Sequence, residues 1–139
     1  MGSLVRTSEA ATLALHAAAI LAGANGEPVS AGTMADNLNA SEAHLAKVLQ
    51  RLAKAGLVRG RRGPGGGFRL TRSPEEVTLR EVYEAIEGHM DIGRCMFGQP
   101  VCGRNECAVG DLFERLNREI TESLGAMTLA DIELRELAL

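Results

Sequence analysis

The stretch LAKVLQRLAKAGLVRGRRGPGGGFRL, residues 45–70, decides the fold of this chain. In its first half, apolar residues recur at the three- and four-residue spacing of an amphipathic helix. These residues are Leu45, Val48, Leu49 and Leu52. Basic residues recur at the same spacing but are displaced around the helix axis; they are Lys47, Arg51 and Lys54. The sequence therefore predicts a helix with an apolar face and an adjoining basic face.

The flanking residues set the ends of this helix and provide a second one. Ser41 is suited to the N-cap, because its hydroxyl can accept a hydrogen bond from an amide of the first turn. Gly56 suits the left-handed backbone that often ends a helix. Residues 32–38 form a shorter predicted helix, and Asn39-Ala40 connects the two. This arrangement is typical of a helix-turn-helix, whose second helix enters the DNA major groove.

The second half of the stretch predicts a hairpin. Leu57-Val58-Arg59 and Phe68-Arg69-Leu70 are short strand-like runs, joined by a turn rich in glycine and arginine at residues 60–67. A basic hairpin directly after a basic recognition helix describes a winged helix-turn-helix. The expected fold class is therefore mostly α with a small β wing, followed by a long dimerisation helix.

The distribution of charge indicates a polyanionic partner. The chain carries 15 basic and 18 acidic residues, a formal net charge of -3, yet residues 43–74 hold eight basic residues and no acidic one. Elsewhere the balance is therefore 7 basic (15 − 8) against 18 acidic residues. Charge alone fits a solvated basic face equally well, but a basic patch carried on a winged helix-turn-helix favours double-stranded DNA as partner. The expected DNA contacts are Ser41, Glu42, His44, Lys47 and Arg51 in the helix, and Arg61 and Arg62 in the wing.

Composition and patterning suggest one DNA-binding domain with an appendage. The chain of 139 residues is 45% hydrophobic and 3% aromatic, which predicts an aliphatic core. No segment has the length of a membrane span and no secretory leader is evident, so the expected location is cytoplasmic, away from any membrane. The predicted divisions are a winged helix-turn-helix domain over residues 1–88, a cysteine loop over 89–108, and a dimerisation helix and tail over 109–139.

The last division contains an apolar stripe at helical spacing. The stripe consists of Val109, Leu112, Phe113, Leu116, Ile120, Leu124 and Met127. It can pack within its own chain or against a second copy. We expect a homodimer, because two recognition helices would then meet DNA half-sites about one helical turn, or roughly 34 Å, apart.

Three cysteines lie in one loop with the spacing C-x6-C-x4-C: Cys95, Cys102 and Cys107. An odd number cannot form a closed disulfide framework. Clustered thiolates suit a soft metal or an iron–sulfur cluster, whereas a zinc ribbon would require two close pairs. The residues alone leave three hypotheses open, namely an iron–sulfur cluster, a thiol redox switch and a zinc site.

Several of these motifs together resemble the Rrf2 family of bacterial winged-helix transcription regulators. The resemblance rests on residues 12–16 (TLALH), the recognition helix, the glycine-rich wing at 62–70, residues 79–88 and the three-cysteine loop. It implies a dimeric DNA-binding regulator, usually a repressor. It also implies that Cys95, Cys102 and Cys107 hold a 2Fe–2S or 4Fe–4S cluster whose state tunes DNA affinity. A purified sample can have lost this cluster.

The fourth cluster ligand departs from the family pattern. Some members have a histidine shortly after the third cysteine, but residues 108–111 (AVGD) contain none. The resemblance then points to His16 of the partner subunit as the fourth ligand. The other candidates, in order, are Glu9 and then Glu106, Asp111 and His89.

Two other functions compete with a cluster-sensing regulator. The first is a regulator of the same fold whose cysteines act directly as thiol switches. The second is a small oxidoreductase that uses the cysteine loop. The chain has neither a Cys-x-x-Cys pair nor a dinucleotide-binding fingerprint, so enzymatic activity is not expected.

Overall fold

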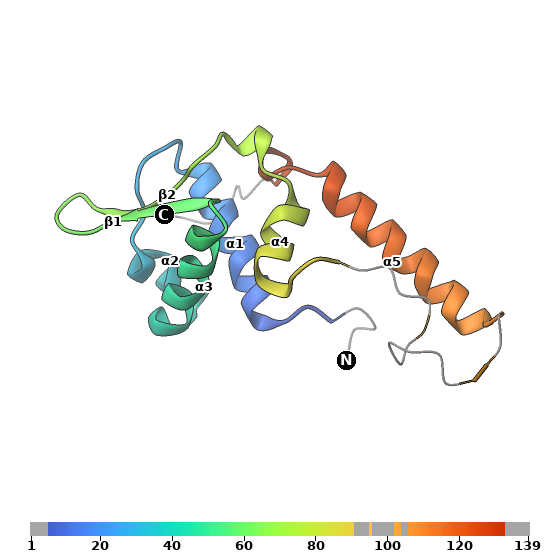
Figure 1. The fold of residues 1–139 in the computed structure, drawn as a ribbon. Helices are drawn as coiled ribbons and strands as arrows, with labels where there is room; N and C mark the ends of the chain where they lie inside the picture. The colour runs from blue at the N-terminus through green and yellow to red at the C-terminus, as the bar shows by residue number, and fades with distance from the viewer. Residues whose placement is uncertain (1–5, 91–94, 96–101, 104–105, 133–139) are drawn as a thin grey trace.

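The computed structural model describes residues 6–90, 95, 102–103 and 106–132. In chain order, its elements are α1 (Glu9–Gly23), α2 (Ala31–Leu38), α3 (Glu42–Lys54), β1 (Val58–Arg61), β2 (Gly67–Leu70), η1 (Pro74–Glu76), α4 (Leu79–Glu87), α5 (Ala108–Ala126) and η2 (Leu129–Asp131). Figure 1 shows α1 to α4 and the hairpin gathered into one head, with α5 projecting away from it. The predicted fold class, a mostly helical winged helix-turn-helix with a long final helix, is confirmed.

Short polar side chains cap the starts of the helices, at Ser41 as the sequence predicts and also at Thr78. The Ser41 hydroxyl accepts from the backbone amide of His44 at 3.3 Å, and the Thr78 hydroxyl accepts from that of Glu81 at 3.1 Å. These bonds satisfy amides that have no partner inside their own helix. At the other end of α3, Gly56 has φ +79°, the left-handed conformation expected there.

The tight connection between α2 and α3 depends on Asn39. This residue is left-handed, with φ 50°, which asparagine tolerates better than most side chains. The turn brings the backbone amide of Ala40 to 2.9 Å from the carbonyl oxygen of Ala35. The chain therefore turns within two residues, and Ser41 caps α3 directly after the turn.

The core of the head is aliphatic, as the composition predicts. On α3, Leu45, Leu49 and Leu52 are fully buried. They face α1, whose inner surface is largely alanine: Ala11, Ala14, Ala17, Ala18 and Ala19 are buried. Small side chains on α1 allow α3 and α4 to pack close to its axis.

The wing is an antiparallel hairpin extended by one residue of a third segment. Val58 pairs with Leu70, and Arg61 with Gly67. Beyond β2, Val29 exchanges two backbone hydrogen bonds with Phe68, at 2.9 and 2.8 Å. These bonds fix the hairpin to the segment that leads into α2.

The far end of α5 returns to the head. The amide of Leu79 donates to the carbonyl oxygen of Met127 at 3.0 Å, and that of Leu129 to Val77 at 2.9 Å. The side chain of Leu129 lies in the core of the head, 1% exposed. Within the described part of the chain, no helix is both long enough and apolar enough to cross a bilayer.

The docking of the wing on Val29 explains one of the wing's glycines. Gly67 has φ +137°, and a Cβ atom there would lie 2.8 Å from the carbonyl carbon of Val29. Gly63 also has a positive φ, +93°, but a Cβ there would meet nothing within 4 Å. Position 63 therefore requires glycine only because of its backbone conformation, whereas position 67 also requires it because the backbone of Val29 lies so close.

We predict that Gly67→Ala lowers the free energy of unfolding by about 2–4 kcal/mol, because it adds a backbone clash to the strain of a positive φ. Gly63→Ala, the control, should cost only about 1 kcal/mol. Urea unfolding followed by circular dichroism would measure both values. Equal losses in the two variants would contradict the close packing of the wing on Val29.

Candidate nucleic-acid interface

The orientation of α3 follows from its buried leucines. Since Leu45, Leu49 and Leu52 face the core together with Val48, the outer face of the helix carries Lys47 and Lys54, which are exposed. Helix α3 is the second helix of the helix-turn-helix, and its outer face is basic. This is the geometry of a recognition helix, whose N-terminal half contacts base edges in the major groove.

The first turn of α3 holds three of the predicted DNA contacts. Ser41, Glu42 and His44 all lie here, at the end that would enter the groove. The Glu42 carboxylate lies across the start of α2, 3.5 Å from where a Cβ of Gly32 would be. The His44 Nδ1 atom is 3.8 Å from the Oε1 atom of Glu9, at the start of α1. The three residues are brought together, but Glu42 and His44 also touch neighbouring helices.

Arg51 lies on a different side of α3. Its Nη2 atom donates a hydrogen bond to the carbonyl oxygen of Ile86, in the last turn of α4. The contact uses one of five guanidinium donors. A DNA contact by Arg51 stays a prediction, but the residue also joins the recognition helix to α4.

The wing carries its positive charge near the tip. Arg61 ends β1 and Arg62 opens the turn, and both are exposed. The turn that follows is closed by a hydrogen bond from the Gly66 amide to the Gly63 carbonyl oxygen, at 2.9 Å. Because glycines form the turn, the loop can approach a phosphate backbone closely.

The strand register adds two arginines that the sequence did not single out. Arg59 on β1 lies directly opposite Arg69 on β2. Like charges at opposed positions repel each other and destabilise a hairpin. A phosphate group beside this pair would relieve the repulsion. What marks Arg59 and Arg69 as candidates is their cross-strand pairing, and the strand boundaries expected from the sequence did not specify which residues pair.

The three cysteines differ in exposure. Cys95 is half-buried, whereas Cys102 and Cys107 are exposed. The Cys107 sulfur accepts from the amide of Gly110 at 3.3 Å and so caps α5. Among the residues that the structure describes, no three His, Cys, Asp or Glu side chains lie close enough together to hold a metal ion. One chain therefore does not assemble the predicted cluster site within its described residues, although three thiols are a donor set that suits iron.

The candidate fourth ligands are spread over the molecule. His16 is exposed on α1, with Nδ1 2.7 Å from the carbonyl oxygen of Thr12. Glu106 and Asp111 are exposed near the start of α5. His89 lies 3.5 Å from Glu84, whose pKa is lowered chiefly because the Met90 amide donates to its carboxylate. His89 is thus paired with an anion on its own chain.

The fold and the basic surface define a winged-helix transcription regulator that binds DNA. Residues 7–133 match the Rrf2 family, described as iron-dependent transcriptional regulators. A helix-turn-helix transcriptional regulator of Azotobacter vinelandii is 35% identical over 124 residues, covering 88% of this chain and 71% of the relative. The chain belongs to the Rrf2 family and is a transcription regulator, not an enzyme.

Two solved structures share the whole fold. The structure of CymR, the global cysteine regulator of B. subtilis, has a TM-score of 0.77 and 28% identity, covering 92% of this chain and 95% of that one. T. potens IscR has a TM-score of 0.75 and 25% identity, covering 98% and 94%. The family membership predicted from the sequence is confirmed.

We predict that replacing Arg61 and Arg62 by Ala weakens binding to all duplex sequences, because phosphate contacts carry no sequence information. The slope of log affinity against log salt should fall by about one for each lost contact. Fluorescence anisotropy over a salt series would measure both. The double variant Arg115→Ala/Arg118→Ala, on α5, removes the same charge and should keep the wild-type slope. An unchanged slope in the wing variant would contradict the wing assignment.

Proposed function

We propose that this chain is a homodimeric repressor whose DNA affinity depends on an iron–sulfur cluster held by Cys95, Cys102 and Cys107. One observation carries the proposal. The thiol-bearing segment joins α4, which contacts the recognition helix through Arg51, to α5, which exposes an unpaired apolar stripe. Chemistry at the cysteines would therefore act between a DNA-reading head and a dimer contact.

The support for a dimer is the exposed surface of α5. The large hydrophobic side chains that are exposed in the described structure all lie on α5 or at its end: Val109 50%, Leu112 43%, Phe113 39%, Leu116 44% and Met127 41%. A contiguous apolar patch of this kind marks a protein interaction site. A second copy is the natural partner, because a two-fold axis places the same stripe on both sides of the interface.

The support for a cluster is the chemistry of the donors. Thiolates bind iron–sulfur clusters, and a bound cluster supplies a centre whose charge changes with oxidation. His16 of the partner subunit remains the leading fourth ligand. Because the Thr12 carbonyl oxygen can only accept, a neutral His16 carries its proton on Nδ1 and leaves the Nε2 lone pair available. Glu9 is second, since its carboxylate already lies beside His44.

A thiol switch without a cluster is the alternative. The exposure of Cys102 and Cys107 favours it, because oxidation of cysteine requires access to solvent. The similarity to CymR, described as a global cysteine regulator, gives the same alternative a precedent within the fold. Iron and sulfide analysis after anaerobic purification separates the two hypotheses.

We predict that Leu116→Glu/Ile120→Glu abolishes the dimer, because it places four carboxylates against one another across a two-fold axis. Light scattering should report a monomer or an aggregate. The control Asn117→Glu/Arg118→Glu adds negative charge to the polar face of the same helix and should remain dimeric. If the first variant stayed a dimer like the wild type, α5 would not be the interface.

We predict that anaerobic reconstitution with iron and sulfide gives a visible chromophore, which Ala substitution at any one of the three cysteines removes or bleaches. His16→Ala should shift the spectrum or hasten its loss while the far-ultraviolet circular dichroism stays unchanged. Absorbance and iron content would measure this. A wild-type protein that takes up no iron would leave the thiol switch as the better account.

A further inference from the structure

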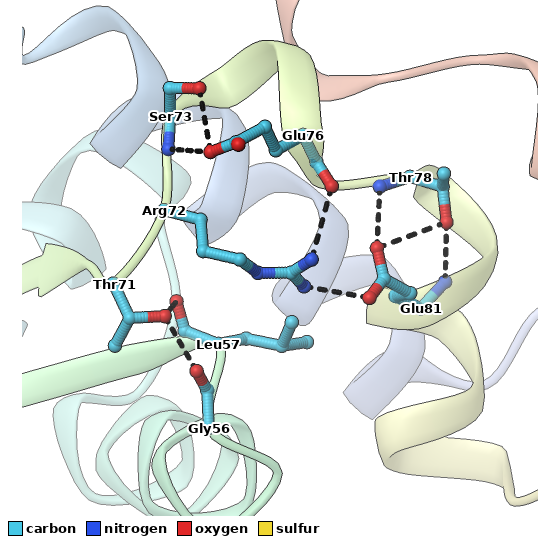
Figure 2. Close-up of polar contacts among 8 residues, drawn as sticks. All are labelled: Gly56, Leu57, Thr71, Arg72, Ser73, Glu76, Thr78 and Glu81. Atoms are coloured by element: carbon cyan, nitrogen blue, oxygen red, sulfur yellow. Dashed lines mark hydrogen bonds and ion pairs between the residues drawn. The ribbon is translucent and has the colours of Figure 1, made fainter.

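Arg72 belongs to the basic stretch, yet its guanidinium is bound to acidic and carbonyl oxygens of the head. Its Nη2 atom lies 2.6 Å from Glu81 Oε1, in the first turn of α4, and its Nη1 donates to the Glu76 carbonyl oxygen at 3.2 Å. Figure 2 shows the guanidinium between these two groups. Two directed hydrogen bonds to separate groups hold the arginine in place, so it differs from Lys47 and Arg61, which point to solvent.

Glu81 uses its two carboxylate oxygens for different purposes. While Oε1 binds Arg72, Oε2 accepts from the backbone amide of Thr78 at 2.9 Å and completes the capping box of α4. Burial raises the pKa of Glu81, but the Thr78 amide and Arg72 together lower it by more than burial raises it, so the net shift is downward. The carboxylate therefore stays charged, and the Glu81 side chain both caps the start of α4 and binds Arg72, two residues after β2.

The residue before Arg72 ties the wing to a second element. The Thr71 amide donates to the Leu57 carbonyl oxygen at 3.1 Å, and its hydroxyl donates to that of Gly56 at 2.6 Å. Gly56 and Leu57 directly follow the recognition helix. Thr71 and Arg72, which directly follow β2, are thus bound to the residues after α3 on one side and to α4 on the other (Figure 2).

We propose that Arg72 is a positioning residue for DNA binding: by pairing with Glu81 it fixes the direction of the wing relative to the recognition helix, and it makes no DNA contact of its own. The proposal rests on the proposed DNA contacts of Arg61 and Arg62. Two protein surfaces that must meet one duplex together require a fixed relative placement. Without this pair, the backbone bonds to Val29 and Leu57 would still hold the wing, but the residue after Thr71 would no longer be bound to α4, which itself contacts α3 through Arg51.

The direction in which one substitution changes DNA affinity distinguishes a positioning role from an effect of charge alone. Glu81→Gln removes a negative charge near a DNA-binding surface, which by electrostatics alone would tighten DNA binding. Glutamine also serves in a capping box, so α4 keeps its start while the ion pair with Arg72 is lost. Positioning predicts the opposite result, weaker binding. Glu75→Gln, an exposed acid close by, is the matched control for charge alone.

The experiment measures the affinity and salt slope of each variant on a duplex selected by the wild-type protein from a randomised pool. We expect Arg72→Ala and Glu81→Gln each to weaken binding about fivefold, and the double variant to weaken it no more than either one. All three should keep the wild-type salt slope, because Arg61 and Arg62 still reach their phosphates in the complex and the loss of affinity is the cost of ordering the wing on binding. Glu75→Gln should bind as the wild type does or slightly more tightly.

Other outcomes would overturn the proposal. A salt slope lowered by about one in Arg72→Ala, with unchanged or tighter binding in Glu81→Gln, would make Arg72 a phosphate contact. Wild-type affinity in both variants would remove any role for the pair. Should Arg72→Ala fail to fold, Arg72→Lys decides, because it keeps the positive charge but cannot make the two directed hydrogen bonds to Glu81 and Glu76. Weaker DNA binding supports positioning, and wild-type affinity contradicts it. If the wild type selected no duplex at all, the proposed DNA contacts would fail instead.

Discussion

Burial of one face of α3 is the constraint on which the rest of the structure depends. Leu45, Leu49 and Leu52 are each 0% exposed, and removing one such side chain from a packed core typically costs about 2–5 kcal/mol. The helix therefore cannot rotate without exposing them. Its other face, which carries Lys47 and Lys54, therefore lies outward. The same apolar contacts that form the core thus also direct the basic surface toward DNA.

Helix α4 contacts the recognition helix, the residue that follows the wing and the end of α5. Arg51 of the recognition helix binds the last turn of α4, and Arg72, after the wing, binds the first turn of α4. The amide of Leu79, at its start, is bound to the end of α5, and Glu87, at its end, accepts a hydrogen bond from the Ser8 hydroxyl. Since the cysteine segment follows α4 and precedes α5, α4 is the element through which the proposed switch would act on the recognition helix and the wing.

The sequence predicts what depends on local rules and misses what depends on distant partners. Ser41 and Gly56 mark the two ends of α3 through local hydrogen bonding and backbone conformation, so their roles could be predicted directly. The role of Arg72 could not, because its partner Glu81 becomes a neighbour only after η1 and α4 fold. The opposition of Arg59 and Arg69 needed an exact strand register, and a shift of one residue would have separated them. Most of the cysteine loop lies outside the described residues, so the cluster ligands remain predictions.

The most direct test of this account is a hydroxyl-radical footprint of the wild-type protein on a duplex selected from a randomised pool. The account predicts two protected segments about one helical turn apart, each with added minor-groove protection where a wing lies. Such a pattern requires two heads held by one dimer and a wing that contacts DNA beside each recognition helix. One uninterrupted protected segment, without flanking minor-groove protection, would contradict both the dimer and the placement of the wing.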